Sequence, residues 1–386
     1  MRKFAMEISA TFLLATAAAV AAGLSVPTAL AEQPTQSAAT TSSRPPRPQE
    51  EALARGSRPY ADHEVSFENG RGHVKLAGTL SLPNGKAPFP AVLLIAASGP
   101  EGRDEEVEGH LVFVVLADHL LRQGIAVLRY DKRGVGASTG DFGTASFDDL
   151  VSDASAAFRY LRARPEIDPR RVGAIGHSEG GSIAPAVAAT DKNVAFVVAM
   201  AGSGLSGEFR VTEHFVYTAQ ENGGSAEQAR AIWQRIFRAV EGTRDDQVAS
   251  SRIAALIDEA VAAKTLTPEQ AADVREATTP KFVREELNDN PISYLKKVKV
   301  PVLALVGSLD RTMPAGPYVE AMQPVLANIP GSKLQVLPGL NHVMQTAETG
   351  SPEEFGTIPE TISPVALTTI GDWVAARCRQ LPATLR

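Results

Sequence analysis

The sequence predicts an α/β protein with a mostly parallel β-sheet, helices on both faces and a helical insertion. Short continuous apolar runs, typical of strands buried on both faces, alternate with longer segments of helical periodicity. That alternation favours parallel strands joined by right-handed crossover helices. It stops between residues 203 and 297, where apolar residues recur only at spacings of three and four, and then resumes.

The folded part is expected to open with a β-hairpin, because residues 63–67 and 74–82 alternate apolar and polar side chains around Asn69-Gly70. The buried strands predicted after it are residues 91–96, 125–130, 171–176, 194–200, 302–306 and 334–337. The helices predicted around the sheet are residues 111–122, 148–164, 183–189, 318–329 and 364–378. In the helix after residue 183, Pro185 is expected in the first turns, where a missing N–H costs least.

The insertion divides the folded chain into three parts. Residues 61–202 and 298–386 are predicted to form one α/β core, and residues 203–297 a helical cap over the strand ends. The clearest cap helices are residues 229–240, 253–263 and 268–277. Ligands in parallel sheets bind beyond the carboxyl ends of the strands, so a cap there would shape the binding pocket.

Composition is ordinary for a globular protein, with 44% apolar and 21% charged residues among 386. The net charge of −6, with no local basic cluster, argues against a nucleic-acid partner. Cys378 is the only cysteine, so an intramolecular disulfide and a cysteine-based metal site are both excluded. Its place in the last predicted helix suggests plain packing.

The N-terminus is predicted to be an export signal, residues 1–31. Arg2 and Lys3 precede an alanine-rich apolar segment, and Ala29-Leu30-Ala31 offers small residues for cleavage before Glu32. An uncleaved membrane anchor is the alternative, which the modest hydrophobicity disfavours. Residues 32–60, rich in Pro, Ser, Thr and Gln, are predicted to be a disordered linker. We therefore expect a periplasmic or secreted protein without stable membrane insertion.

The pattern Gly176-His177-Ser178-Glu179-Gly180 lies between a predicted strand and a predicted helix. A turn this sharp strains the central residue, and flanking glycines remove the Cβ atoms that would clash. It would lift the Ser178 hydroxyl above the sheet edge, at the N-terminus of a helix. The pattern favours a nucleophilic serine over a chance turn.

A serine hydroxyl needs a base to take its proton and a third group to orient that base. Of the seven histidines, His342 alone follows the last strand in a flexible loop, while the side chain of His177 is expected to point away from the nucleophile. Asp310 follows a buried strand and is the predicted acid, although a helix N-cap or turn role is the alternative. Asp289 is a weaker choice of acid inside the insertion.

An oxyanion hole requires two backbone N–H donors. One is expected from Glu179, directly after the nucleophile, and the other from the loop after the strand 91–96. Pro100 has no N–H, which leaves Ser98 or Gly99, and we favour Ser98. The run after Asp131 lacks the third glycine of a dinucleotide motif, because Thr139 stands there. No organic cofactor or metal is predicted.

These pieces together resemble the α/β-hydrolase superfamily, in particular bacterial esterases and serine aminopeptidase-like hydrolases with a helical cap. The resembling segments are Ser98-Gly99-Pro100-x-x-Arg103-Asp104, Asp131-x-Arg133-Gly134-x-Gly136-x-Ser138, the Gly176–Gly181 run, the Asp310 loop and Asn341-His342. They extend from about residue 65 to the C-terminus, and Ser178, Asp310 and His342 stand in the family order. The chain departs from many relatives at Ala96-Ala97, where those carry His-Gly.

The resemblance implies hydrolysis of a small-molecule carboxylic ester through an acyl-serine. Cleavage of an amide, as in an aminopeptidase, is the alternative, since Glu179 and the Glu101–Glu108 cluster could bind a substrate amine. Glu179 could equally form a salt bridge within the loop. A catalytically silent fold used for binding is a further alternative, although all three predicted triad residues are present. Acyl-chain length, natural substrate and oligomeric state do not follow from the sequence.

Overall fold

The computed structural model describes residues 45–380 except 203, 222, 264 and 289. The predicted signal peptide, residues 1–31, and most of the predicted linker lie outside the described residues, as do Asp289 and residues 381–386. No helix in the described part of the chain combines the length and hydrophobicity that crossing a bilayer requires.

The centre of the structure is an eight-stranded sheet in the order β1-β2-β6-β3-β7-β8-β9-β10. The strands are β1 (Tyr60–Asn69), β2 (Val74–Pro83), β3 (Phe89–Ile95), β6 (Ala126–Tyr130), β7 (Ile167–His177), β8 (Val197–Met200), β9 (Val302–Gly307) and β10 (Lys333–Leu337). Only β2 runs antiparallel to its neighbours β1 and β6, and every other pairing is parallel. The predicted mostly parallel sheet is confirmed.

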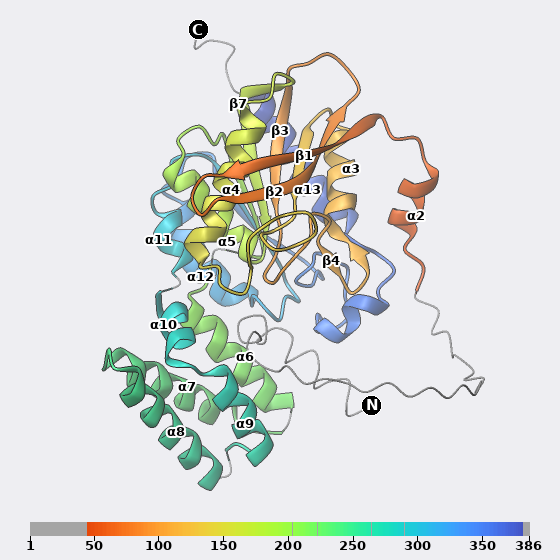
Figure 1. Cartoon of the computed structure of the whole chain (residues 1–386). Helices are drawn as coiled ribbons and strands as arrows, with labels where there is room; N and C mark the ends of the chain where they lie inside the picture. The colour runs from red at the N-terminus through yellow and green to blue at the C-terminus, as the bar shows by residue number, and fades with distance from the viewer. Residues whose placement is uncertain (1–44, 203, 222, 264, 289, 381–386) are drawn as a thin grey trace, which may run out of the picture.

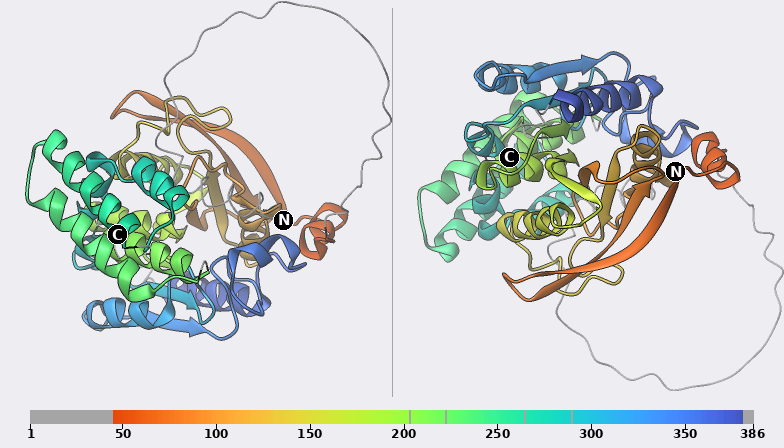
Figure 2. Two further views of the ribbon diagram at one scale, coloured as in Figure 1. Left: turned by 90° about the horizontal axis from the view of Figure 1, so that it is seen from below. Right: turned by 90° about the horizontal axis from the view of Figure 1, so that it is seen from above.

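Helices cover both faces of this sheet (Figures 1 and 2). The helices packed on the core are α3 (Val112–Leu121), α4 (Phe147–Arg162), α5 (Glu179–Thr190), α12 (Ala315–Leu326) and α13 (Pro364–Gln380). Leu93 of β3 packs in the same apolar cluster as helices α4, α5 and α12, whereas its neighbours Val92 and Leu94 pack in the cluster of α3 and α13. The continuous apolar runs in the sequence therefore reflect strands buried on two sides.

The predicted strands and helices are found with shifted ends, and the structure contains further elements that were not predicted, among them helices α2 (Pro48–Arg55), α6 (Gly207–Glu221), α10 (Pro280–Asn288) and α11 (Pro291–Leu295). A two-stranded ribbon, β4 (Glu106–Val107) and β5 (His110–Leu111), and a 3-10 helix, η1 (Pro352–Thr357), lie in segments without clear periodicity. Pro185 is not in the first turns of its helix but in the interior of α5, because α5 begins directly after Ser178. The first hairpin turns over residues 70–73, since Asn69 still pairs with Val74.

Between β8 and β9 the described residues contain helices only. They are α6 (Gly207–Glu221), α7 (Ala226–Glu241), α8 (Asp246–Ala262), α9 (Pro268–Ala277), α10 (Pro280–Asn288) and α11 (Pro291–Leu295). Helices α6 to α9 form a group below the sheet in the view of Figure 1. Trp233, Phe237 and Ile257 belong to an apolar cluster of this group, separate from both clusters of the sheet. The segment thus stabilises itself by its own buried surface.

The prediction of a disordered linker through residue 60 is wrong for its last part. Residues 48–55 form helix α2 (Pro48–Arg55), which packs near α3, and Leu53 is buried. The Arg47 side chain donates hydrogen bonds to the carbonyl oxygens of Gly356 at 2.8 Å, Ile358 at 3.0 Å and Glu108 at 3.2 Å. A low-complexity composition gave no sign of these tertiary partners, which offset the entropy of ordering the segment.

We expect Arg47→Ala to lower the free energy of unfolding by about 1–3 kcal/mol, because three partly buried carbonyl groups lose a charged donor. Denaturant unfolding measures the change. Arg55→Ala, at the other end of this helix, is the matched control: the Arg55 side chain is 76% exposed and, among the residues that the structure describes, pairs with Glu51 alone. Its removal should have no measurable effect, and equal effects of both substitutions would contradict the docking role of Arg47.

Candidate active site

Ser178 stands at a strained turn between β7 and α5. Its φ of 52° and ψ of −116° are unusual for a residue with a side chain. The turn is close-packed: a Cβ atom at Gly176 would lie 1.9 Å from the carbonyl oxygen of Gly180, and one at Gly180 would lie 2.0 Å from that of Ile95. The predicted need for glycine on both sides of Ser178 has this steric cause.

Ser178, His342 and Asp310 form one hydrogen-bonded chain. His342 Nε2 lies 3.1 Å from Ser178 Oγ, and His342 Nδ1 lies 2.9 Å from Asp310 Oδ2. A carboxylate only accepts hydrogen bonds, so Nδ1 carries the proton and Nε2 is left to accept from the serine hydroxyl. Asp310 and His342 are 4% and 7% exposed, which shields the pair from water.

Asp310 combines the two roles that the sequence analysis set against each other. Its Oδ1 accepts the backbone N–H of Met313 at 2.6 Å, as in a capping turn, while Oδ2 faces the histidine. The turn therefore orients the carboxylate rather than competing with the histidine for it.

The His342 loop is held against the Asp310 loop by backbone contacts. A Cβ atom at Gly307 would lie 2.1 Å from the carbonyl oxygen of Leu340, and Leu309 N–H donates to that oxygen at 2.9 Å. Within the loop, the Asn341 side chain donates to Gln345 Oε1 at 2.9 Å and accepts the Gln345 backbone N–H at 2.9 Å. A loop expected to be flexible is therefore braced at both ends.

In the loop after β3, the backbone N–H that was predicted as an oxyanion donor is not used by another hydrogen bond of the described residues. The N–H of Ala97 is occupied, because it donates to Glu105 Oε1 at 2.8 Å. The N–H of Ser98 makes no hydrogen bond within the described part of the chain. Glu179 is the first residue of α5, so its N–H has no acceptor inside the helix. Strand register places the two segments side by side, since Ile95 is opposite Gly176.

The side chain of Glu179 forms a salt bridge instead of facing a substrate. Its Oε2 lies 2.8 Å from Nζ of Lys132, and Lys132 also donates to the carbonyl oxygen of Ala97. Lys132 was not among the residues expected at the site, although it stands only two positions after the buried strand β6. This side chain is 3% exposed and lies 5.3 Å from the Phe142 ring centre.

His177 points away from the serine, as predicted, and meets a residue that sequence reasoning missed. Its Nδ1 lies 2.8 Å from Glu105 Oε1, and its Nε2 donates to the backbone carbonyl of His342 at 3.0 Å. Burial acts to lower the pKa of His177, but the charge and hydrogen bond of Glu105 outweigh it and raise that pKa. Only the Glu101–Glu108 cluster as a whole, not Glu105, stood out in the sequence.

A cavity of about 360 Å³ lies at the segment 101–106. It is lined by Glu101, Gly102, Arg103, Asp104, Glu105, Glu106, Leu111 and Asp131. Burial, and then the nearby charge of Glu105, raise the pKa of Glu101 to about 7. Two of the other carboxylates are paired with arginines, Asp131 with Arg103 and Asp104 with Arg129.

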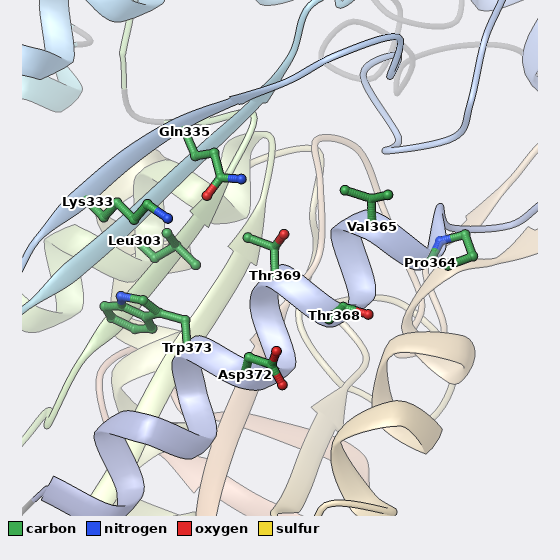
Figure 3. A pocket seen from close by; sticks show the side chains of 9 residues that line it. All are labelled: Leu303, Lys333, Gln335, Pro364, Val365, Thr368, Thr369, Asp372 and Trp373. Carbon is green, nitrogen blue, oxygen red and sulfur yellow. The ribbon is translucent and has the colours of Figure 1, made fainter.

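A larger hollow, of about 670 Å³, lies away from Ser178 between the sheet and α13 (Figure 3). Lys333, Gln335 and Trp373 are among the residues that line it. None of the predicted site residues is among those that line it. No group of three or more metal-binding side chains occurs among the residues that the structure covers.

Two relatives share sequence with part of the chain. Esterase EstD of Thermotoga maritima is 35% identical over 134 residues, which cover 34% of this chain and 32% of the relative. The uncharacterized protein PA2218 of Pseudomonas aeruginosa is 32% identical over 138 residues, 35% of each chain. The matched segments thus span about a third of the length of these relatives.

Solved structures show the same fold. The esterase Pf2001 of Pyrococcus furiosus matches with a TM-score of 0.51 at 18% identity, covering 83% of this chain and 92% of its own. The crystal structure of PA2218 matches with a TM-score of 0.52 at 18% identity, covering 84% and 95%. Identity this low supports the architecture alone.

Two family descriptions each match more than half of the chain. Residues 108–348 match "Serine aminopeptidase, S33", and residues 9–206 match "Esterase FrsA-like". Both agree with the eight-stranded, mostly parallel sheet and with the resemblance drawn from the motifs. The chain belongs to the serine aminopeptidase S33 family of α/β-hydrolases and is esterase-like in sequence.

Proposed function

We propose that the protein is a serine carboxylesterase that acts through an acyl-serine intermediate. The observation that carries this proposal is the unbroken chain of hydrogen bonds from Ser178 through His342 to Asp310. Each role has a residue of the required type: Ser178 as the nucleophile, His342 as the base and Asp310 as the carboxylate that orients the base.

In the proposed reaction, Ser178 Oγ attacks the ester carbonyl while His342 Nε2 takes the hydroxyl proton. Asp310 stabilises the imidazolium that forms. His342 then protonates the leaving alcohol, and afterwards activates the water that releases the acid. The backbone N–H groups of Glu179 and Ser98 would hold the oxyanion, each donor being worth about 3 kcal/mol in the transition state.

An ester is favoured over an aminoacyl amide as the substrate. Binding a substrate amine requires carboxylates that are not already neutralised, and Glu179 is paired with Lys132 while Glu105 is paired with His177. Esterase EstD, which shares sequence with this chain, carries the activity in its name. Peptidase activity is the second candidate, supported by the acidic cavity at Glu101 and Glu106.

Helices α6 to α11 are proposed to act as a cap that sets the length of the acyl group. They are inserted between β8 and β9, and the Tyr318 hydroxyl donates to the carbonyl of Gly202, at the start of this insertion, at 3.0 Å. A silent binding role is disfavoured, because such proteins usually lose a member of the triad and this chain has a connected one.

Residues 32–386 should hydrolyse p-nitrophenyl esters, with an optimum at one acyl length, and should cleave aminoacyl-p-nitroanilides far more slowly. Ser178→Ala should abolish ester turnover, lowering kcat by about 10⁴-fold or more. Asp310→Asn should lower it by about 10⁴-fold, because the amide favours the wrong histidine tautomer. Steady-state kinetics on both substrate series measure these effects.

A fluorophosphonate probe provides the control, since it should label the wild-type protein but not Ser178→Ala. Preferential anilide cleavage would overturn the ester assignment in favour of a peptidase. A wild-type protein that neither turns over a substrate nor reacts with the probe would contradict the enzyme proposal altogether.

The N-terminal segment is proposed to direct export and to be removed. The full-length chain, produced in a bacterial host, should appear in the periplasm or medium with a mass that begins at Glu32. Arg2 and Lys3 changed to Glu should reduce export without changing the folded part. Retention of the intact N-terminus in a membrane fraction would indicate an anchor instead.

A further inference from the structure

Both polar groups of the Ala97 backbone are bound by charged side chains. The N–H donates to Glu105 Oε1 at 2.8 Å, and the carbonyl oxygen accepts a hydrogen bond from Lys132 Nζ. Loop backbone usually bonds to other backbone or to water. Here an anion and a cation hold one residue from opposite sides.

The other ends of the two side chains reach the residues on either side of Ser178. Glu105 Oε1 is also 2.8 Å from His177 Nδ1, and Lys132 Nζ is 2.8 Å from Glu179 Oε2. The residue before the nucleophile and the residue after it are therefore each connected to Ala97 through one charged side chain.

Peptide geometry makes this arrangement relevant to the oxyanion hole. The carbonyl of Ala97 and the N–H of Ser98 belong to one planar trans peptide, so they point in opposite directions. Holding the oxygen on the Lys132 side directs the Ser98 N–H to the other side. Alanine at positions 96 and 97 has no polar side chain that could fix these planes. Lys132 holds the Ala97–Ser98 peptide through its carbonyl oxygen, and Glu105 holds the preceding Ala96–Ala97 peptide through its N–H.

Burial shows that the arrangement is costly for folding. Glu105 is 0% and Lys132 2% exposed, and Glu105 has a φ of 49°. Its Oε2 is buried and has no hydrogen-bond partner within the described residues. Apolar side chains of similar size often stabilise such positions at least as well as a buried ion pair. The charges are therefore better explained by positioning than by stability.

We propose that Lys132 and Glu105 are positioning residues that orient the Ala97–Ser98 peptide, and thereby the Ser98 N–H, toward the oxyanion formed at Ser178. This inference rests on the proposed ester hydrolysis. The two arms act as braces between the oxyanion loop and the nucleophile turn. His177, which also donates to the His342 carbonyl, extends the Glu105 arm to the loop of the base.

Lys132→Met and Glu105→Leu each remove one brace at nearly constant volume. Either substitution should lower kcat for the best p-nitrophenyl ester about 10–100-fold. A misplaced Ser98 N–H would bind the oxyanion less well, and the oxyanion develops only in the transition state. KM should change less than about twofold. The affinity for an arylboronic acid, which forms a tetrahedral adduct with serine, should fall in parallel with kcat.

Two further variants separate positioning from folding. Glu105→Gln keeps an acceptor oxygen for Ala97 and should recover most of kcat. Arg133→Met removes a comparably buried ion pair, with Asp153 at 2.7 Å, and Arg133 makes no hydrogen bond to residues 96–99. It should lower the melting temperature but leave kcat within about twofold. Should Glu105→Leu fail to fold, Lys132→Met tests the Ala97–Ser98 peptide directly, because Lys132 binds the carbonyl oxygen of that peptide.

An unchanged kcat in folded Lys132→Met would overturn the proposal. A fall in the kcat of Arg133→Met in proportion to its loss of stability would also overturn it, because kcat would then depend on stability and not on the position of the peptide. A rise in KM at constant kcat in Lys132→Met and Glu105→Leu would also overturn it, since the braces would then affect substrate binding. These outcomes require an active wild-type enzyme. An inactive wild type would instead contradict the proposed function, and the positioning role would fall with it.

Discussion

The positive φ of Ser178 is the constraint on which the arrangement of the site depends. It leads the chain from β7 directly into α5. This reversal is possible because Gly176 and Gly180 have no Cβ atom, and backbone atoms of other residues occupy the space where one would lie. The same close approach brings the end of β3 against the start of α5. The loop after β3 and Ser178 are thus neighbours, because the backbones of β3 and α5 approach each other without an intervening side chain.

Around this turn, buried charged side chains hold the loop backbone by hydrogen bonds. Lys132, Glu105 and His177 are each nearly inaccessible, and each has a partner of opposite charge or a backbone group. In a medium of low dielectric such pairs hold geometry firmly, and a broken pair is costly. Rigidity of this kind would suit the proposed oxyanion site, where the charge to be bound develops only in the transition state.

Elements far from the turn serve the core in other ways. Helix α2 packs against α3 and the loop near Gly356, and the side chains of Arg47, Gln49 and Glu50 anchor it there by hydrogen bonds. Helices α6 to α9 carry an apolar cluster of their own. A segment with its own buried surface can change length and sequence without disturbing the sheet, which is how one fold accommodates different substrates.

The sequence by itself predicted most of the strands and core helices and the helical insertion. It also singled out Ser178, Asp310 and His342, which the structure brings into one hydrogen-bonded chain. These follow from local patterns: apolar runs for strands buried on two faces, and a glycine-flanked serine for the turn. It did not determine helix α2, the interior place of Pro185 in α5, or the roles of Glu105 and Lys132. Those depend on partners distant in sequence. A charged residue in a polar loop gives the same sequence pattern whether its side chain is solvated or, like Lys132, binds a peptide 35 residues away. Only the tertiary structure decided which of the acidic residues were paired.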